Sequence, residues 1–572
     1  MTGPKGLAGG LSNYGDPAFS AYLRRSFARS MGYSSDLLKR PVIGIASTAS
    51  DFNNCHRGVP RLVEAVKRGV LSAGALPLEF PLPSLGEVFL SPTSMVYRNL
   101  LAMAAEEMIR AQPMDAVVLI GGCDKTLPAL AMGAISAGRP AVILATGPMM
   151  TSRFAGERLG ACTDCRRFWA QYRAGTIDDA TIDAIEGSLA TTEGTCSVMG
   201  TASSMAILCE TMGLMLPGTA AIPAVHADRL RAAEASGRVA VNLAQTGLTP
   251  EKLLSQASFD NAMKMLLAIG GSTNAVIHMA AIAGRLGLDF SLDKLNALSD
   301  VIPVLVDLKP TGEGYMEDFF AAGGVGAMLS RLADHIDFDV PTVTGGTLAA
   351  YRQDTGVCVE DRVIRPLDNP VRETGGLVAL FGSLAPNGAI FKRAAATPAL
   401  FETTARAVVF DGLEDLTRRI DDPNLDVAAS DILVLRNIGP LAAGMPEAGY
   451  IPIPAKLARA GVTDMLRMSD GRMSGTAFGS IVLHISPESA AGGPLALVET
   501  GDQIRVSVAQ RRLDLLVSEQ DLEARKRRLQ RIDTERKRGW IGLYGRHVMQ
   551  APDGCDLDFL VADSIDTEEQ KR

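Results

Sequence analysis

The first third of the chain alternates short apolar runs with segments of helical periodicity. The apolar runs, each bounded by turn residues, are PVIGIAS (41–47), PLEF (77–80), AVVLIGG (116–122) and PAVILATG (140–147). The helical patterns between them lie near 60–73, 95–111 and 127–137. Strands that alternate with helices are typical of a parallel sheet, because each helix returns the chain to the edge where the next strand begins. The sequence therefore predicts an α/β domain in this region.

From about residue 380 the pattern changes to short β-like runs separated by Gly, Pro and Asp turns. The runs are GLVALFG (376–382), ARAVVF (405–410), DILVLRN (431–437), SIVLHIS (480–486) and DQIRVSV (502–508). This pattern favours a β-barrel-like domain. A chain of 572 residues is also too long for a single core to be expected. We predict an α/β domain over 1–375 and a β-rich domain over 376–572.

Charge and hydropathy argue against two classes of partner. The 56 basic and 64 acidic residues give a net charge of -8, so we expect no nucleic-acid partner. The start, MTGPKGLAGG, lacks the charged and apolar regions of a signal peptide. The most apolar stretch, 127–150, is interrupted by Arg139, Pro140 and Pro148. We therefore expect no membrane association and a cytoplasmic location.

Sulfur-bearing and charged residues follow the first three predicted strands. They are Cys55 in NNCHRG (53–58), Glu87 in SLGEVF (84–89), and Cys123, Asp124 and Lys125 in GGCDKT (121–126). Ligands of parallel sheets bind beyond the carboxyl ends of the strands, so we expect these side chains to converge on one crevice. A fourth loop, EGTCSVMGTASSM (193–205), places Cys196 among small residues just before an apolar helix.

The residue types in these loops suit two kinds of metal. A thiolate suits an iron–sulfur cluster or zinc, whereas a carboxylate suits magnesium or manganese. Lys125 is unexpected beside a divalent cation, because its ammonium must point away, lose its proton or be chemically changed. His56 follows Cys55 directly, and because adjacent side chains on an extended loop diverge, we expect it to support the site rather than bind a metal.

Two loops of the predicted β-rich domain also carry candidate residues. GMPEAG (444–449) contains Glu447, and SDGRMSGTAFG (469–479) contains Ser474 and Thr476. Taken alone, both stretches are equally compatible with ordinary turns.

The pair Cys162-x-x-Cys165 matches the spacing of a zinc or thiol-redox site. It has no second pair at zinc spacing, so a local structural or pocket-lining role is favoured. Eight cysteines in a cytosolic chain of this size do not predict a disulfide framework.

Several stretches together resemble the family of dihydroxy-acid and sugar-acid dehydratases, which includes dihydroxy-acid dehydratase and 6-phosphogluconate dehydratase. They are NNCHRG, GGCDKT, EGTCSVMGTASSM, GGSTNAVIHMAAIAGRLGL (270–288), DLKPTGEGYMEDFFAAGG (307–324), GMPEAG, SDGRMSGTAFG and GCDLDFL (554–560). The resemblance runs nearly the whole chain and depends on the number and order of these motifs.

The resemblance implies roles for individual residues. Three cysteines would hold an iron–sulfur cluster, with 2Fe–2S favoured over 4Fe–4S: Cys55, Cys123 and Cys196. Four residues would bind Mg²⁺: Glu87, Asp124, Glu447 and Lys125. In relatives this lysine can be carbamylated, which would turn an ammonium into an anionic oxygen ligand. Ser474 would be the catalytic base and Thr476 would contact the substrate, and a neutral Lys125 is the competing base.

The implied reaction removes water from a 2,3-dihydroxy carboxylate and yields a 2-keto-3-deoxy acid. EGTCSVMGTASSM, GERLGACTDCRRFW (156–169) and RMSGTAFG favour a pentonate or related sugar-acid dehydratase. We therefore expect a hydro-lyase that acts on an aldonate, a pentonate or hexonate, and forms a homodimer or homotetramer. The alternatives are the dihydroxy-acid dehydratase of branched-chain amino acid biosynthesis and a non-catalytic iron–sulfur sensor.

Overall fold

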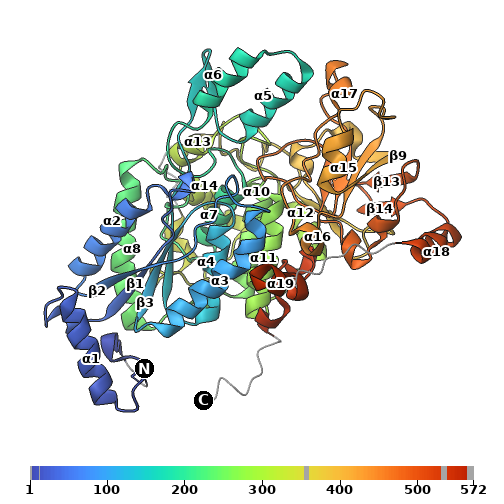
Figure 1. Cartoon of the computed structure of the whole chain (residues 1–572). Coiled ribbons are helices and arrows are strands. Elements are labelled where there is room, and N and C mark those ends of the chain that lie inside the picture. Colours follow the sequence, from blue (N-terminus) through green and yellow to red (C-terminus); the bar gives the residue numbers. More distant parts are fainter. Residues whose placement is uncertain (1–2, 12, 353–359, 530–537, 563–572) are drawn as a thin grey trace.

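A four-stranded parallel sheet forms the centre of the N-terminal domain (Figure 1). The computed structural model describes residues 3–11, 13–352, 360–529 and 538–562. The strands, in the spatial order β2-β1-β3-β4, are β1 (Val42–Ser47), β2 (Leu76–Pro81), β3 (Ala116–Gly121) and β4 (Ala141–Ala145). All three pairings are parallel, which confirms the α/β prediction.

The helices between these strands begin and end within one residue of the prediction. They are α2 (Val59–Ser72), α3 (Ser94–Ala111) and α4 (Thr126–Ala137). Helix α2 packs against α8 (Ala227–Thr246). Gly69 makes this possible, because a Cβ there would lie 1.9 Å from the carbonyl oxygen of Glu234. The two helices therefore touch backbone to backbone and cover one face of the sheet.

Three further helices form an interior layer. They are α7 (Thr201–Thr211), α10 (Gln256–Ala268) and α11 (Thr273–Leu286). Every residue of α7 is buried, as expected for a helix that is packed on all sides. The N-termini of α7 and α11 contact a loop from the C-terminal domain.

The strand order fixes where a site can form. The chain passes from β1 to β2 on one side, whereas β3 lies on the other side of β1. The connections therefore diverge between β1 and β3, and a crevice opens at the carboxyl ends of these two strands. The loops that follow them contain Cys55 and Cys123.

An eight-stranded sheet forms the C-terminal domain, in the order β14-β13-β9-β10-β11-β12-β8-β7. Its strands are β7 (Val378–Leu380), β8 (Ala389–Phe391), β9 (Glu402–Asp411), β10 (Ile432–Arg436), β11 (Arg467–Ser469), β12 (Ile481–Leu483), β13 (Gln503–Ser507) and β14 (Arg512–Leu515). An isolated bridge between Phe381 and Arg512 brings the two edges together, so the sheet nearly closes. The barrel-like prediction is confirmed.

The remaining elements cover the two sheets and join them. A hairpin is formed by β5 (Ser152–Phe154) and β6 (Glu157–Leu159). The other helices are α1 (Pro17–Ser30), α5 (Thr163–Ala174), α6 (Asp179–Leu189), α9 (Pro250–Leu253), α12 (Leu292–Val301), α13 (Met316–Ala321), α14 (Gly324–Arg331), α15 (Gly412–Arg419), α16 (Pro440–Ala443), α17 (Ala455–Arg459), α18 (Glu519–Arg528) and α19 (Gly539–His547). Figure 1 shows α5 and α6 as an arm at the upper edge, where α5 contacts α17 of the C-terminal domain.

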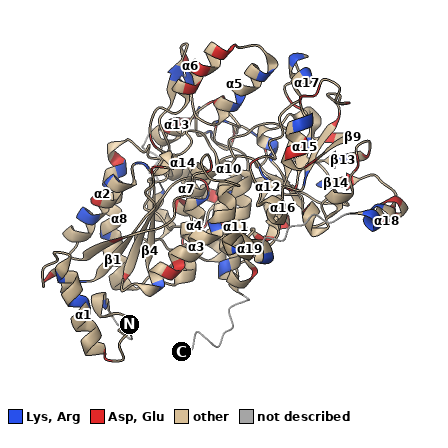
Figure 2. Cartoon of the chain, in the orientation of Figure 1, with Lys and Arg blue, Asp and Glu red and all other residues tan. Residues whose placement is uncertain are grey.

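The surface carries both signs of charge. Figure 2 shows Lys and Arg interspersed with Asp and Glu over the outer helices, while the interior layer is largely uncharged. Among the helices that the structure describes, none is long and apolar enough to cross a membrane.

Candidate active site

The loop after β1 is fixed to the loop after β3 by a buried histidine. The side chain of Asn53 accepts a hydrogen bond from the backbone N–H of Cys55 at 3.1 Å and so begins a short 3₁₀ turn over Asn54–His56. His56 Nε2 accepts from the N–H of Gly122 at 2.9 Å, and Nδ1 lies 3.0 Å from the carbonyl oxygen of Thr48. Burial lowers the pKa of His56 to about 4, so the ring is neutral and can accept. His56 therefore links the loop that carries Cys55 to the loop that carries Cys123.

Four thiols converge at this point. The thiols of Cys55 and Cys123 interact, and this interaction together with burial raises the pKa of Cys123. The pKa of Cys196 is raised by its contact with Cys162, by burial, and by the proximity of Cys55 and Cys123. The structure thus brings together the three cysteines that the sequence analysis selected, and it adds Cys162.

Three carboxylates lie next to the thiols. One oxygen each from Glu87, Asp124 and Glu447 lies within 4.8 Å of the others. Glu87 follows β2 and Asp124 follows β3, whereas Glu447 comes from the C-terminal domain. The sulfur of Cys123 lies 3.5 Å from a carboxylate oxygen of Asp124, so the thiol and carboxylate groups adjoin. The site therefore lies between the two domains.

Two buried cations balance these carboxylates. Lys125 is fully buried, contacts Asp124 and lies 3.7 Å from Glu87. Arg472, also fully buried, donates to Glu447 at 2.8 Å and to Glu87 at 2.9 Å. The sequence analysis did not select Arg472, although it lies in the quoted stretch SDGRMSGTAFG, because nothing in that stretch shows which side chain becomes buried.

The pKa values of the two glutamates move in opposite directions. Burial raises the pKa of Glu447, and Arg472 offsets only part of the effect because Glu87 and Asp124 lie close by. At Glu87 burial also acts upward, but Arg472, Lys125 and two hydroxyl donors lower its pKa to about 2. Burial would lower the pKa of Arg472, yet the neighbouring carboxylates raise it. The three carboxylates and two cations therefore form a cluster with a net negative charge, and of the two glutamates Glu447 is the one whose charge is balanced less.

The loop after β11 brings Ser474 and Thr476 to the same region. Their hydroxyl oxygens lie 2.8 Å apart. A Cβ on Gly475, between them, would lie 2.4 Å from the hydroxyl of Ser272 and 2.8 Å from the backbone nitrogen of Thr201. Only glycine allows this approach, which places the loop against the N-termini of α7 and α11.

Neighbouring residues tie this loop to both domains. Asn274 on α11 donates to the carbonyl oxygen of Met473 at 3.0 Å. Met473 in turn forms an isolated β-bridge with Ala448, the residue after Glu447. Arg472, Met473 and Ser474 are consecutive in this loop. Arg472 binds the carboxylates, Met473 pairs with the segment that carries Glu447, and Ser474 is the candidate base.

The donor sets fit the groups that the resemblance implies. Carboxylate oxygens are ligands of Mg²⁺, and three of them lie within 4.8 Å of one another, close enough to bind one ion. Converging thiols suit an iron–sulfur cluster. Without a metal, burial and the neighbouring thiols disfavour the thiolate forms of Cys123 and Cys196, whereas a bound metal favours thiolate ligands. The arrangement can therefore hold two electron-withdrawing centres side by side.

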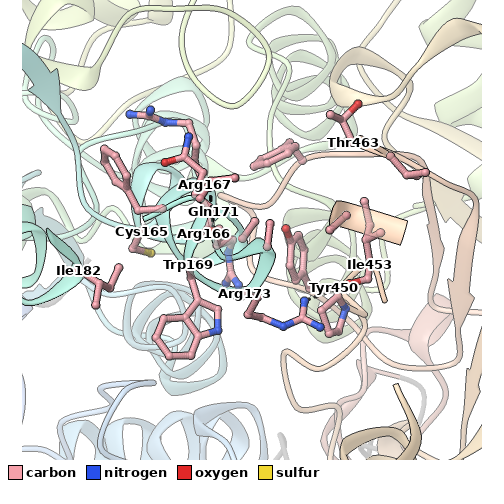
Figure 3. Close-up of a pocket in the computed structure, with 18 of the residues that line it drawn as sticks. Cys165, Arg166, Arg167, Trp169, Gln171, Arg173, Ile182, Tyr450, Ile453 and Thr463 are labelled. Carbon is pink, nitrogen blue, oxygen red and sulfur yellow. Dashed lines mark hydrogen bonds between the residues drawn. The ribbon is translucent and has the colours of Figure 1, made fainter. Parts of the chain in front are cut away.

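A pocket of about 900 Å³ lies between the arm and the C-terminal domain (Figure 3). It is lined by α5 and α6 of the arm and by Tyr450, Ile453 and Phe478 of the C-terminal domain. Arg166 joins the pocket to the site: its guanidinium lies 3.7 Å from Glu447 and 5.0 Å from the centre of the Tyr450 ring. Cys165 lines this pocket, in agreement with one of the roles favoured for it.

Comparison with known proteins gives a consistent result over the whole chain. The model of the dihydroxy-acid/6-phosphogluconate dehydratase N-terminal domain matches residues 40–351, and that of the C-terminal domain matches residues 362–555.

Individual relatives match over nearly their full length. The chain is 44% identical to a 6-deoxy-6-sulfo-D-gluconate dehydratase of Pseudomonas putida over 92% of each chain. It is 43% identical to an L-arabinonate dehydratase of Rhizobium leguminosarum bv. trifolii (strain WSM2304), over 96% of this chain and 95% of the relative. A dihydroxy-acid dehydratase of Clostridium botulinum (strain Eklund 17B / Type B) is 35% identical over 93% of this chain and 97% of its own.

Proposed function

The chain belongs to the dihydroxy-acid/6-phosphogluconate dehydratase family, whose members are hydro-lyases, and we propose that it dehydrates a sugar acid to the 2-keto-3-deoxy acid. The substrate would be a pentonate or hexonate. The observation that carries the proposal is the adjoining pair of donor sets, three thiols and three carboxylates, with Ser474 two residues beyond Arg472, which donates to two of the carboxylates. The names of relatives at 43–44% identity support the sugar-acid class over the branched-chain acid at 35%.

Two groups would be held by this chain. Cys55, Cys123 and Cys196 would hold an iron–sulfur cluster, favoured as 2Fe–2S, and Glu87, Asp124 and Glu447 would bind Mg²⁺. When bound, these groups supply Lewis acidity, Mg²⁺ toward the substrate carboxylate and 2-hydroxyl and the cluster toward the departing 3-hydroxyl. Carbamylation of Lys125 would add a fourth oxygen ligand and remove an ammonium from beside the cation.

Ser474 would remove the proton from C2. A serine hydroxyl is a weak base at its ordinary pKa, so its surroundings must favour the anionic form. The loop lies against the N-termini of α7 and α11, whose partial positive charge stabilises an anion. The hydroxyl of Thr476, 2.8 Å away, can donate a hydrogen bond to the same oxygen. Ser474 is therefore the base that the local structure favours.

The pocket beside the site gives room for the rest of a sugar acid. It opens next to Glu447 at Arg166, whose Nε is buried and has no partner within the described parts of the chain. The pocket's polar lining residues, among them Arg166, Gln171 and Thr463, could hydrogen-bond the hydroxyls of a polyhydroxylated chain, whereas the methyl groups of a branched-chain acid could not use them. Sites that hydrogen-bond a hydroxyl discriminate strongly against analogues that lack it.

The proposal is tested by an anaerobic screen of aldonic acids with detection of 2-keto-3-deoxy products. We expect kcat/KM for a five- or six-carbon aldonate to exceed that for 2,3-dihydroxyisovalerate by at least about 100-fold. A preference for the branched-chain acid would contradict the substrate class. Absence of iron and acid-labile sulfide from anaerobically purified protein would contradict the cluster.

A further inference from the structure

Cys162 points at a proposed cluster ligand rather than at its sequence neighbour. Its sulfur lies 2.7 Å from the sulfur of Cys196, closer than two unbonded sulfur atoms normally approach. Cys165, the other member of the C-x-x-C pair, instead contacts the carbonyl oxygen of Cys162. The thiol-redox pairing that the spacing suggests is therefore replaced in the structure by a pairing across 34 residues.

The turn that carries Cys162 holds its backbone in a rare conformation. Cys162 has φ +85° and ψ -50°, in the γ-turn region that residues with a side chain seldom adopt. Strain of this kind persists only where the surroundings impose it, and it clusters at functional sites.

Contacts on both sides of Cys162 impose this conformation. The hydroxyl of Thr163, the next residue, donates to the carbonyl oxygen of Thr476 at 2.9 Å. Asp164 accepts from the N–H of Gly160 at 2.8 Å, from Lys309 at 2.9 Å and from the Tyr315 hydroxyl at 2.8 Å. Hydrogen bonds with residues of both domains thus fix the turn on either side of Cys162, and the thiol of Cys162 points toward Cys196.

We propose that Cys162 and Cys196 form a disulfide when the cluster is absent, and that this bond withdraws Cys196 from the ligand set until a thiol reduces it. The inference rests on the proposed role of Cys196 as a cluster ligand. Both cysteines are only half-buried, so a small oxidant can reach them. The oxidant we name is a low-molecular-weight disulfide.

The reaction consists of two thiol–disulfide exchanges. The thiolate of one cysteine attacks the small disulfide, forms a mixed disulfide and releases one small thiolate. The thiolate of the second cysteine attacks the protein sulfur of that mixed disulfide and releases the second small thiolate. The two cysteines lose two protons and two electrons, and the small disulfide is reduced to two thiols.

The test uses full-length protein from which iron has been removed by anaerobic chelation. It is treated with bis(2-hydroxyethyl) disulfide, its remaining thiols are alkylated, and peptides are mapped by mass spectrometry. We expect the cross-linked pair 162–196 to be the main product. The competing product is a Cys55–Cys123 disulfide, because those thiols are also in contact, and its dominance would overturn the proposal.

Reloading with iron and sulfide gives a second measurement. Oxidised wild-type protein should recover its cluster absorbance only after a thiol reductant is added. In Cys162→Ser the resolving thiol is absent, so Cys196 should be mapped as a free thiol or as the mixed disulfide with 2-mercaptoethanol, not in a disulfide within the chain. Cys165→Ser is the matched control on the same helix and should behave as wild type. If fully oxidised wild-type protein reloads its cluster without a reductant, the proposal is wrong. Iron and sulfide content before oxidation tests the ligand assignment separately, since peptide mapping does not depend on it.

Discussion

Ser474 is the residue whose assigned role is most easily separated from the rest of the site. Its hydroxyl is 2.8 Å from that of Thr476 and contacts none of the thiols or carboxylates assigned to the metals in the described structure. We expect Ser474→Ala to keep iron, sulfide and Mg²⁺ while kcat falls by about 10²–10⁴-fold, because only proton transfer is lost.

Exchange of the C2 hydrogen with solvent deuterium checks this result independently. The Ser474→Ala enzyme should lose any exchange that the native enzyme shows, whereas Thr476→Ala should be milder and raise KM as a substrate contact would. The competing base is Lys125. Near-normal turnover in Ser474→Ala, combined with loss of activity but not of Mg²⁺ in Lys125→Met, would assign proton removal to Lys125.

Arg472 acts on the carboxylates rather than on the substrate. It is the residue that donates to both Glu87 and Glu447, through different nitrogens of one guanidinium. Lysine cannot reproduce this fork. Since residues that orient metal ligands typically contribute 10–100-fold to affinity, we expect Arg472→Lys to weaken Mg²⁺ binding by about that factor.

A titration of Mg²⁺ into chelator-treated protein measures this effect by calorimetry and by recovery of activity. Arg512→Lys is the control, because Arg512 pairs with Asp514 on β14. An unchanged Mg²⁺ affinity in Arg472→Lys would mean that the arginine has no part in holding the carboxylates.

At the scale of elements, the loop after β1 depends on a neutral histidine. The pKa of His56 is about 4 in the folded chain, because burial opposes its charge, against about 6.5 unfolded. The unfolded chain therefore binds more protons between these values. Stability contributed by the neutral ring is present above pH 6.5 and is lost as the pH falls toward 4, by about 3 kcal/mol in full.

Thermal unfolding of cluster-free protein between pH 7 and 4.5 measures this loss. His56→Gln should show a shallower fall in unfolding temperature with decreasing pH than wild type. His226→Gln, a surface histidine that caps α8, is the control and should keep the wild-type slope. Identical slopes for all three proteins would show that His56 is not the group responsible.

The sequence predicts elements well where a local pattern determines them. The four apolar runs became β1 to β4. Three of them are rich in Val, Ile or Leu and buried throughout, as is typical of strands in parallel sheets, whereas β2 is only partly buried. Convergence of Cys55, Glu87 and Cys123 followed, because parallel strands share one carboxyl edge. Arg472 and the Cys162–Cys196 contact could not be predicted, because both depend on tertiary contacts: a domain closing over the carboxylates and a clamped turn at the start of α5.

At the scale of the molecule, exposed aromatic side chains on α1 are a candidate surface for the predicted contact between two copies of the chain. Helix α1 leaves Phe19, Tyr22 and Phe27 exposed, at 46%, 60% and 66%. Apolar rows of this kind mark interaction surfaces. The expected homodimer or homotetramer stays a prediction. We expect Phe27→Glu to lower the molar mass of this assembly, as measured by light scattering after size exclusion. Leu413→Glu, an exposed change on α15, should not, and an unaltered mass for Phe27→Glu would exclude α1 from the interface.

The end of the chain holds the N-terminal domain through a buried ion pair. Asp556 is fully buried and accepts from Arg285 on α11 at 2.8 and 3.1 Å. Arg98 on α3 donates to the adjacent carbonyl oxygens of Gly554 and Cys555 at 2.8 and 2.9 Å. The motif GCDLDFL is thereby explained: it returns the chain from the β-rich domain to helices α3 and α11.

Removing one member of this pair should destabilise the whole molecule. Asp556→Asn leaves the buried guanidinium of Arg285 with Glu106, at 3.5 Å, as its remaining counter-charge, and breaking a buried ion pair typically costs about 3–5 kcal/mol. We expect scanning calorimetry to show a fall of several degrees in unfolding temperature, with the iron content of freshly prepared protein unchanged. Asp558→Asn, two residues away, alters an exposed carboxylate that pairs with His547 and should shift the temperature little. Equal effects of the two changes would mean that the ion pair between Arg285 and Asp556 does not hold the domains together.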